Sequence, residues 1–309
     1  MPFKRGQLRY FVTVAEEGQM TRAAAKLNIA QPALSQAISH LESELGFQLL
    51  ERHPRGVTLT PAGETFLEKA RLALAAATDA ALTAQSLARA GRGAIEFGYL
   101  GLPPGLTNPD LIEVFTEAHP DITLRLHELP FPSIPTASWL GEVDVAIASR
   151  PAADPDVWVL ALSTEPRVVL APKGHPLAKR AELTVAEMLD ETFLGFQPQV
   201  DPAWAGFWSL DDHRGGPAPH LTGECSANAR ERFALIAAGH GIATVPACHA
   251  AIIVKVLPGA VAIPLPDADP TVLALVGHKD RRNPLVEALL AVARNLAEDD
   301  ADGPLPASA

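Results

Sequence analysis

The chain has 309 residues, of which 48% are hydrophobic and 20% are charged. This composition is ordinary for a soluble globular protein and excludes a disordered or fibrous chain. The length allows one short domain and a larger two-lobed one. The N-terminus becomes charged too soon for a signal peptide, and no uncharged apolar stretch of about 20 residues occurs, so we expect a cytoplasmic protein.

Charge and cysteine content indicate which partners and which kinds of site the chain can have. The net charge is −11, but residues 1–90 hold 10 Lys and Arg against 8 Asp and Glu, so the negative excess lies in the rest of the chain. Only the N-terminal part is therefore expected to bind the phosphate groups of a nucleic acid. Two cysteines, Cys225 and Cys248, exclude a disulfide framework or a Cys-rich zinc site, and the histidines have no ligand-like spacing. We expect no metal and no cofactor.

Apolar residues at helical spacing predict three short helices, over 7–18, 20–27 and 31–45. Two such helices joined by a tight turn are typical of a helix-turn-helix, whose second helix enters the major groove. The outward positions of that helix are Gln31, Ser35, Gln36 and Ser39. Gln can pair bidentately with adenine and Ser suits several base edges, so this polar face without acids favours DNA reading.

Residues 47–60 follow as two apolar runs on either side of a Pro/Gly turn that carries Arg52 and Arg55. The pattern predicts a β-wing that presents arginines to a phosphate backbone or a minor groove. The alternative is that Arg52 and Arg55 are ordinary surface charges.

Residues 61–90 predict one long helix, because Thr60 suits an N-cap, Pro61 suits the first turn and no breaker follows. A seam of small apolar residues runs along it: Leu67, Ala70, Leu74, Ala77, Ala81, Ala84 and Ala88. The natural partner of this seam is a second copy of the helix. A long surface helix packed on its own domain is the alternative.

Beyond a flexible junction at 90–93, short apolar strands alternate with helices, which indicates doubly wound α/β lobes with ligands at the carboxyl ends of strands. Strands are expected at 95–100, 122–129, 143–148, 157–162, 168–171, 192–196, 242–245 and 272–276. Helices are expected at 109–118, 185–189, 201–210, 227–238 and 284–296.

Residues 8–66 resemble the N-terminal domain of the LysR-type transcriptional regulators. The matched positions are Phe11, Thr21 to Ala24, Leu27, Gln31 to Ser35, Leu41, Glu42, Leu45, Gly46, Leu49, Arg52 and Thr58 to Gly63. So many positions at the right spacing make the resemblance specific. Ala30 and Leu50 depart from the Ser and Phe that the family favours, and neither change removes a groove-facing donor. A weaker match extends over almost the whole chain, including Pro109 to Ile147 and Ala238 to Pro246.

The resemblance implies an α+β multidomain fold. A winged helix-turn-helix over 1–60 and a dimerising linker helix over 61–90 precede a two-lobed α/β effector domain over 91–297 that is similar to a periplasmic binding protein. Lobe I is expected at about 94–160 and 264–297, lobe II at about 164–263, and a disordered tail at 298–309. The implied partners are double-stranded promoter DNA, a small-molecule effector between the lobes, a second copy or a dimer of dimers, and RNA polymerase. No membrane partner is expected.

The resemblance also assigns candidate site residues. DNA binding is expected at Thr21, Arg22, Gln31, Pro32, Ser35, Gln36, Ser39, Arg52 and Arg55. Effector binding is expected at Leu100, Gly101, Leu102, Pro130, Phe131, Phe196, Gln197, Asn228 and Val245. A pocket lined by these residues would have few hydroxyl groups. Such a pocket favours a hydrophobic or aromatic ligand over a small dicarboxylate, although backbone N–H groups can hold a carboxylate. Phe196, Trp204, Phe207 and Trp208 form an aromatic cluster whose use is pocket lining or, for most of them, core packing.

Two other functions stay open at this point. A regulator that responds to redox state or to a partner protein would need no ligand, and Cys225 and Cys248 are the candidate redox groups. A solute-binding protein or an enzyme can use the same two-lobed body. No hydrolase, P-loop or dinucleotide motif is present, so we expect no enzyme activity.

Overall fold

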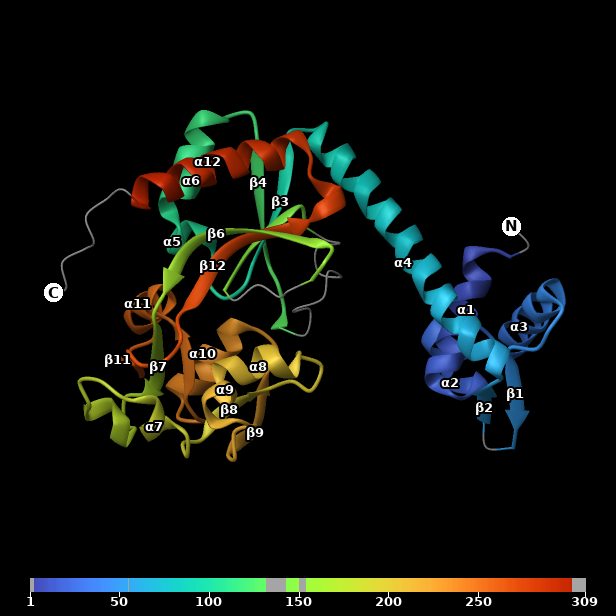
Figure 1. The fold of residues 1–309 in the computed structure, drawn as a ribbon, viewed down its shortest axis with the longest axis horizontal. Coiled ribbons are helices and arrows are strands. Elements are labelled where there is room, and N and C mark those ends of the chain that lie inside the picture. Colours follow the sequence, from blue (N-terminus) through green and yellow to red (C-terminus); the bar gives the residue numbers. More distant parts are fainter. Residues whose placement is uncertain (1–2, 55, 132–142, 150–153, 302–309) are drawn as a thin grey trace. The chain divides into compact units, whose positions relative to one another are not determined.

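The computed structural model describes residues 3–54, 56–131, 143–149 and 154–301. It divides into two compact units, Met1–Ala84 and Gln85–Ala309, and the division falls inside the predicted linker helix. Figure 1 shows both units, which are described separately below. Among the described residues, none of the helices is both long and apolar enough to span a membrane.

The first unit is a small helical domain with a two-stranded wing (Figure 1). Its elements are α1 (Arg5–Glu17), α2 (Met20–Leu27), α3 (Gln31–Leu45), β1 (Leu50–His53), β2 (Gly56–Leu59) and the first part of α4 (Pro61–Ala90). The predicted bounds of the second and third helices and of the long helix are confirmed. Gly18, Asn28 and Gly46 end the three short helices with φ of 63°, 54° and 79°, a left-handed conformation open mainly to Gly and Asn.

The core of this unit includes side chains from the first part of α4. Leu34, Ile38 and Leu41 on one stripe of α3 are fully buried, together with Phe11 of α1. Ala70 of α4 is buried in the same core, and Leu67 and Leu74 pack against it. The first part of the predicted seam is therefore used inside the unit, whereas Ala81, Ala84 and Ala88 are exposed.

The second unit contains two lobes. Lobe I is built from β3 (Ala94–Tyr99), α5 (Pro104–Thr107), α6 (Pro109–Ala118), β4 (Thr123–Glu128), β5 (Val145–Ser149), β6 (Val157–Glu165), β12 (Thr271–His278), η4 (Lys279–Arg281) and α12 (Pro284–Ala301). Its sheet has the order β4-β3-β5-β12-β6, with β3 parallel to β4 and β5, and β12 antiparallel to β5 and β6. Helices α6 and α12 cover one face of this sheet (Figure 1).

Side chains alternate across that sheet as the period of two requires. Val145 and Ile147 face the core under α6 and α12, whereas Ala146 and Ala148 belong to the cluster on the opposite face. That second cluster continues into lobe II through residues such as Leu170 and Trp204. The carboxyl ends of β3 and β5 therefore lie where the two lobes meet.

Lobe II holds an antiparallel sheet of order β10-β7-β11 and a parallel pair β8-β9. Its elements are β7 (Arg167–Pro172), η3 (Pro176–Lys179), α7 (Val185–Met188), β8 (Phe193–Phe196), α8 (Pro202–Trp208), α9 (Asp211–Arg214), β9 (Leu221–Ser226), α10 (Ala229–Ala237), β10 (Ala243–Pro246), α11 (Ala247–Val256) and β11 (Ala260–Pro264). The chain passes between the lobes at β6 to β7 and again at β11 to β12.

Several elements differ from the sequence expectation. Strands β9 and β11 and helix α11 were not predicted. Helix α12 runs to Ala301, so the expectation of a disordered tail from residue 298 is wrong over 298–301. No proline or glycine interrupts the helix before Gly303, so nothing in the backbone ends it earlier. Residues 302–309 lie outside the described part of the chain.

Candidate functional sites

The exposed face of α3 carries the polar residues that the sequence predicted to face DNA. Gln31, Gln36 and Ser39 are exposed and Ser35 is half-buried, while the opposite stripe forms the core. Pro32 occupies the first turn of α3 and is exposed, as are Thr21 and Arg22 at the start of α2. The predicted set therefore lies on an accessible surface of one unit.

Arg52 on β1 connects the wing to this face of α3. Its Nη1 donates to Ser35 Oγ at 2.9 Å and its Nη2 to Ser39 Oγ at 3.3 Å. The three residues thus form one cluster, in which the guanidinium lies beside the helix that the sequence assigns to the groove. Arg55, the other arginine of the predicted wing, lies outside the described residues.

Two buried contacts fix the wing against α3 and α4. Glu42 of α3 is only 7% exposed, and its Oε1 accepts from the backbone N–H groups of Leu49 at 2.8 Å and Leu50 at 3.1 Å. A Cβ at Gly63 would lie 2.0 Å from Leu49 O, so only glycine allows α4 to approach this closely. The exposed face depends on these contacts because they hold the wing beside α3.

A hollow in the second unit is lined by both lobes. Lobe I contributes Leu100, Gly101, Phe131 and Ser149. Lobe II contributes Phe196, Trp204, Trp208, Ala229, Arg232, Phe233, Thr244, Val245, Pro246 and His249. Its volume is about 50 Å³, which exceeds the roughly 15 Å³ that a water molecule needs but is far below the roughly 150 Å³ that can hold a benzene ring.

Aromatic rings form much of the wall. Phe131 of lobe I lies 5.3 Å from Phe196 and 5.7 Å from Trp204, and Trp204 lies 5.8 Å from Trp208, measured between ring centroids. The sequence predicted that Phe196, Trp204 and Trp208 belong to one aromatic cluster. All three rings line the hollow, and all three also pack against the core. Phe207 is used for packing, since the Arg167 guanidinium lies 4.0 Å from its ring centroid.

Polar groups are few and buried. Ser149 Oγ, Trp204 Nε1 and Trp208 Nε1 have no hydrogen-bond partner among the described residues. The Arg232 side chain is 3% exposed and donates to the carbonyl oxygens of Leu194 and Gly195, each at 3.0 Å. Burial lowers the pKa of Arg232 to about 9, so the guanidinium still carries its charge at neutral pH.

The two lobes are in close contact where Gly101 of lobe I faces His249 of lobe II. Gly101 has φ of 90°, and a Cβ there would lie 3.1 Å from Cε1 of the imidazole ring. Burial lowers the pKa of His249 to about 4, so the ring is neutral at pH 7. A side chain at position 101 would therefore be strained and would also push against the ring.

The hollow contains five of the nine residues that the sequence assigned to effector binding: Leu100, Gly101, Phe131, Phe196 and Val245. The other four do not line it. Leu102 packs against the adjoining core, and the Asn228 side chain accepts from Glu231 N at 2.9 Å to cap α10. Pro130 and Gln197 lie next in sequence to lining residues.

Ser149, Arg232 and His249 line the hollow but were not predicted to do so. No local pattern marks them, because each becomes part of the wall only when β5, α10 and α11 meet. A buried arginine is rare, and Arg232 follows the charged residues Arg230 and Glu231 in the first turn of α10, so nothing in the sequence indicated that this side chain is the buried one.

Cys248 and the acidic cluster of lobe II do not have the surroundings that redox or metal chemistry needs. Burial, together with Glu165, raises the pKa of Cys248 to about 12, which is the opposite of what a reactive thiolate needs. Asp212, His213 and Asp269 approach one another, but the Arg167 guanidinium lies 3.2 Å from His213 Nε2 and opposes a cation there.

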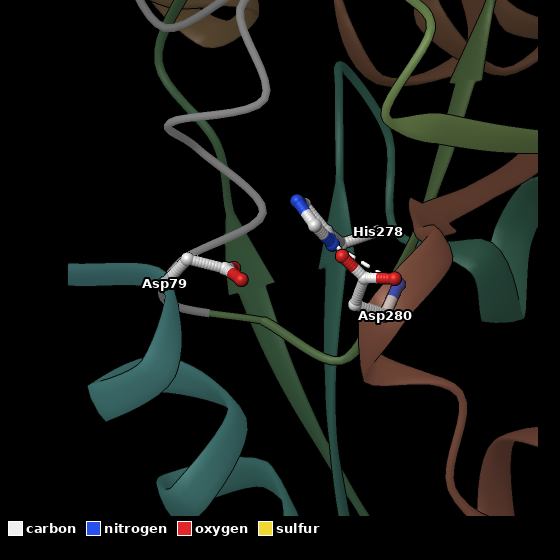
Figure 2. A group of neighbouring side chains, drawn as sticks. All are labelled: Asp79, His278 and Asp280. Atoms are coloured by element: carbon white, nitrogen blue, oxygen red, sulfur yellow. Dashed lines mark hydrogen bonds between the residues drawn. The ribbon is translucent and has the colours of Figure 1, made fainter. Parts of the chain in front are cut away.

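Figure 2 shows His278 and Asp280 at the start of η4. The His278 ring accepts from the backbone N–H of Asp280 at 3.2 Å and so caps this short helix. Asp79, the third residue drawn, belongs to the other unit, and we assign no metal site to the three.

Comparisons with known proteins agree with the division of the chain into an N-terminal unit and a larger second unit. The model described as "Bacterial regulatory helix-turn-helix protein, lysR family" matches residues 6–64, and the "LysR substrate binding domain" model matches residues 88–298. The transcriptional regulator TdfR of Cupriavidus pinatubonensis is 33% identical over 289 residues, which cover 93% of this chain and 97% of TdfR. BenM of Acinetobacter baylyi is 34% identical over 245 residues, covering 78% of this chain and 79% of BenM. The crystal structure of full-length CbnR complexed with its target DNA has a TM-score of 0.52 at 25% identity and covers 96% of this chain and 100% of that one.

Proposed function

The chain belongs to the LysR family of DNA-binding transcription regulators with an effector-binding domain, and from that premise we propose which of its residues do this work. The exposed polar face of α3 recognises promoter DNA, and the hollow between the two lobes of the second unit binds the effector. The observation that carries the proposal is that each unit contains one such site: the expected residues of α3 are accessible, and five of the nine residues expected to bind the effector line the hollow.

The DNA-reading face is Gln31, Ser35, Gln36 and Ser39, with Thr21, Arg22 and Pro32 beside it. Support comes from the exposure of these residues on the side of α3 that the core leaves free. Arg52 already donates to Ser35 and Ser39, so its charge is held at the edge of the groove-facing helix, where a phosphate would lie. Arg55 is proposed as a second phosphate contact on the wing.

The hollow suits an effector because both lobes line it. A ligand that contacts Phe131 and Ser149 on one side and Trp204 and Arg232 on the other has a different free energy for each arrangement of the lobes. Such a difference is what allows a ligand to shift a conformational equilibrium. The walls favour an apolar or aromatic molecule.

The active form is proposed to be a dimer or a dimer of dimers. The exposed residues Ala81, Ala84 and Ala88 of α4 form the available part of the seam, and small side chains allow a second helix to approach closely. A rearrangement of the effector domains would change the spacing of paired reading helices on DNA and so the recruitment of RNA polymerase. The protein would act in the cytoplasm, where promoter DNA is, and not as an enzyme.

A gel-shift titration of the full-length protein tests the function. The probe is the DNA immediately upstream of its own gene, and the matched control is a scrambled duplex of the same length and composition. We expect retention of the upstream DNA at concentrations that leave the scrambled duplex free. Equal, strongly salt-dependent retention of both duplexes would contradict specific recognition of that site.

A further inference from the structure

The wing arginine and two hydroxyls of the reading face form a small hydrogen-bond network. Arg52 on β1 donates through Nη1 to Ser35 Oγ at 2.9 Å and through Nη2 to Ser39 Oγ at 3.3 Å. The two serines are about one turn of α3 apart, so their hydroxyls lie on the same side of the helix. A guanidinium has N–H donors and no acceptor, so in both contacts the hydroxyl oxygen must accept.

The hydrogen atoms of these two hydroxyls have no acceptor in the unit. Hydroxyls on helices commonly donate to the carbonyl oxygen one turn earlier, as Thr65 does to Pro61 O at 3.2 Å. Within the described part of the chain, neither Ser35 Oγ nor Ser39 Oγ donates to any acceptor. Both O–H groups are therefore available to another molecule.

Thr78 of α4 shows how such a hydroxyl is completed. Its Oγ1 accepts from Arg5 Nη2 at 3.2 Å and donates to Leu74 O at 2.9 Å. A hydroxyl that accepts from a cation becomes a stronger donor and a weaker acceptor, because hydrogen bonds in a chain polarise one another. Ser35 and Ser39 have the same cationic donor but lack the carbonyl, so the missing partner is an acceptor.

We propose that Arg52 is a positioning residue for sequence recognition, which keeps the hydroxyls of Ser35 and Ser39 as donors that read guanine. The inference rests on the proposed DNA-reading role of α3. In the major groove guanine offers two neighbouring acceptors, N7 and O6, whereas cytosine offers only the N4 donor. Adenine sets a donor beside its acceptor, and thymine sets a methyl group beside its acceptor, so both fit a polarised O–H less well.

This role differs from that of a phosphate contact. Two N–H groups of Arg52 point to the serines, and no carboxylate in the described residues forms an ion pair with the guanidinium. Its remaining N–H groups can still bind a phosphate oxygen. Loss of a phosphate contact weakens binding to every sequence alike, whereas loss of a positioning residue changes the preference only at the base pairs that the serines read.

The base pairs read by the serines are located first. The full-length parent chain, Ser35→Ala and Ser39→Ala are titrated in gel shifts against the DNA upstream of the gene. The same titrations use duplexes in which each base pair of the protein-protected region is replaced in turn. A base pair is assigned to a serine when the parent distinguishes it by about fivefold, the contribution of one hydrogen bond, and the alanine variant does not. We expect the assigned pairs to be G·C, and assigned A·T pairs, or no assigned pair, would overturn the proposal.

Arg52→Met then tests the positioning role, because it removes the donors and keeps a long side chain. We expect it to lose about fivefold of the preference for guanine at the assigned pairs, while any further weakening is equal on all duplexes. Arg52→Lys restores charged N–H donors and should recover part of the preference. Arg5→Met is the matched control, since the hydroxyl that Arg5 contacts already has its acceptor within the protein, and it should leave every preference unchanged.

Two results of the Arg52→Met titrations would overturn the positioning role. Uniform weakening with an intact preference for guanine would show a phosphate contact alone. A preference that is lost in Arg52→Met and kept in both serine variants would mean that the arginine itself reads the base. Arg52 is exposed, so we expect all variants to unfold at the temperature of the parent chain, which circular dichroism checks.

Failure of the proposed function gives a different result. The parent chain would then retain the upstream and scrambled duplexes equally, before any variant is compared, and the inference would be contradicted together with the DNA recognition on which it rests.

Discussion

The reading face and the hollow are built in opposite ways. The reading face lies on one helix of one unit, so the spacing of residues in α3 already decides which side chains are exposed. The hollow is assembled from segments between Leu100 and His249 that belong to both lobes. A site on one helix can therefore be found from local periodicity, whereas a site between lobes depends on long-range packing.

The largest effect is expected from a substitution that removes the support of the reading face and leaves the hollow unchanged. Gly63→Ala places a Cβ 2.0 Å from Leu49 O, and we expect the first unit to lose about 3 kcal/mol or more of its unfolding free energy. Thermal unfolding followed by circular dichroism measures the loss, which should be accompanied by loss of DNA retention.

Gly6→Ala is the matched control. Nothing lies within 4 Å of a Cβ at that position, which is inside α1, so alanine should leave stability unchanged or raise it slightly. A Gly63→Ala protein as stable as Gly6→Ala would show that the close approach of α4 to Leu49 is not required.

A pH titration tests the buried imidazole of His249 in the wall of the hollow. The pKa of His249 is about 4 in the folded protein against 6.5 in the unfolded chain, so the unfolded chain binds more protons between these values. The stability of the folded protein is complete above about pH 6.5 and falls as the pH drops to about 4, by roughly 3 kcal/mol in total from this group.

His249→Gln keeps a neutral polar side chain that does not titrate. Denaturant unfolding at several pH values should give a shallower acid loss for this variant than for the parent chain. Identical slopes for the two proteins would contradict the assigned burial of the ring.

A milder change tests how the wing is held. Glu42→Ala leaves the N–H groups of Leu49 and Leu50 buried without their acceptor, at a cost of about 2 kcal/mol to the first unit. Glu42→Gln retains an acceptor oxygen and should recover part of the loss. Chemical denaturation of the three proteins compares them, and an unchanged midpoint for Glu42→Ala would rule out the structural role of this carboxylate.

Sequence reasoning was most successful where structure is local. It gave the bounds of α2, α3 and α4, because caps and apolar stripes mark them. It missed α11, which is apolar over most of its length and so lacks a clear helical face, and β11, a five-residue strand bounded by Gly259 and Pro264. Short apolar runs of this kind do not distinguish helix from strand.

The candidate sites show the same difference between features set by local sequence and features set by long-range packing. Gln36 and its neighbours could be assigned from helical spacing, and their exposure is as expected. In the hollow, only the residues at strand ends and the aromatic cluster could be proposed. Ser149, Arg232 and His249 could not, because their burial around one space depends on contacts between segments far apart in the chain.

Gln36, on the exposed face of α3, is proposed to read the DNA sequence, and a comparison of DNA affinities tests this role. The affinities of the parent chain, Gln36→Ala and Gln85→Ala are measured on the natural operator and on a scrambled duplex. Gln85 is an exposed glutamine on α4, so its loss removes the same side chain away from the reading face.

We expect Gln36→Ala to lose about tenfold of its preference for the operator and to bind scrambled DNA as before, since one bidentate base contact contributes about 1–3 kcal/mol. Gln85→Ala should keep the full preference. If Gln36→Ala keeps it as well, the assigned reading face is contradicted.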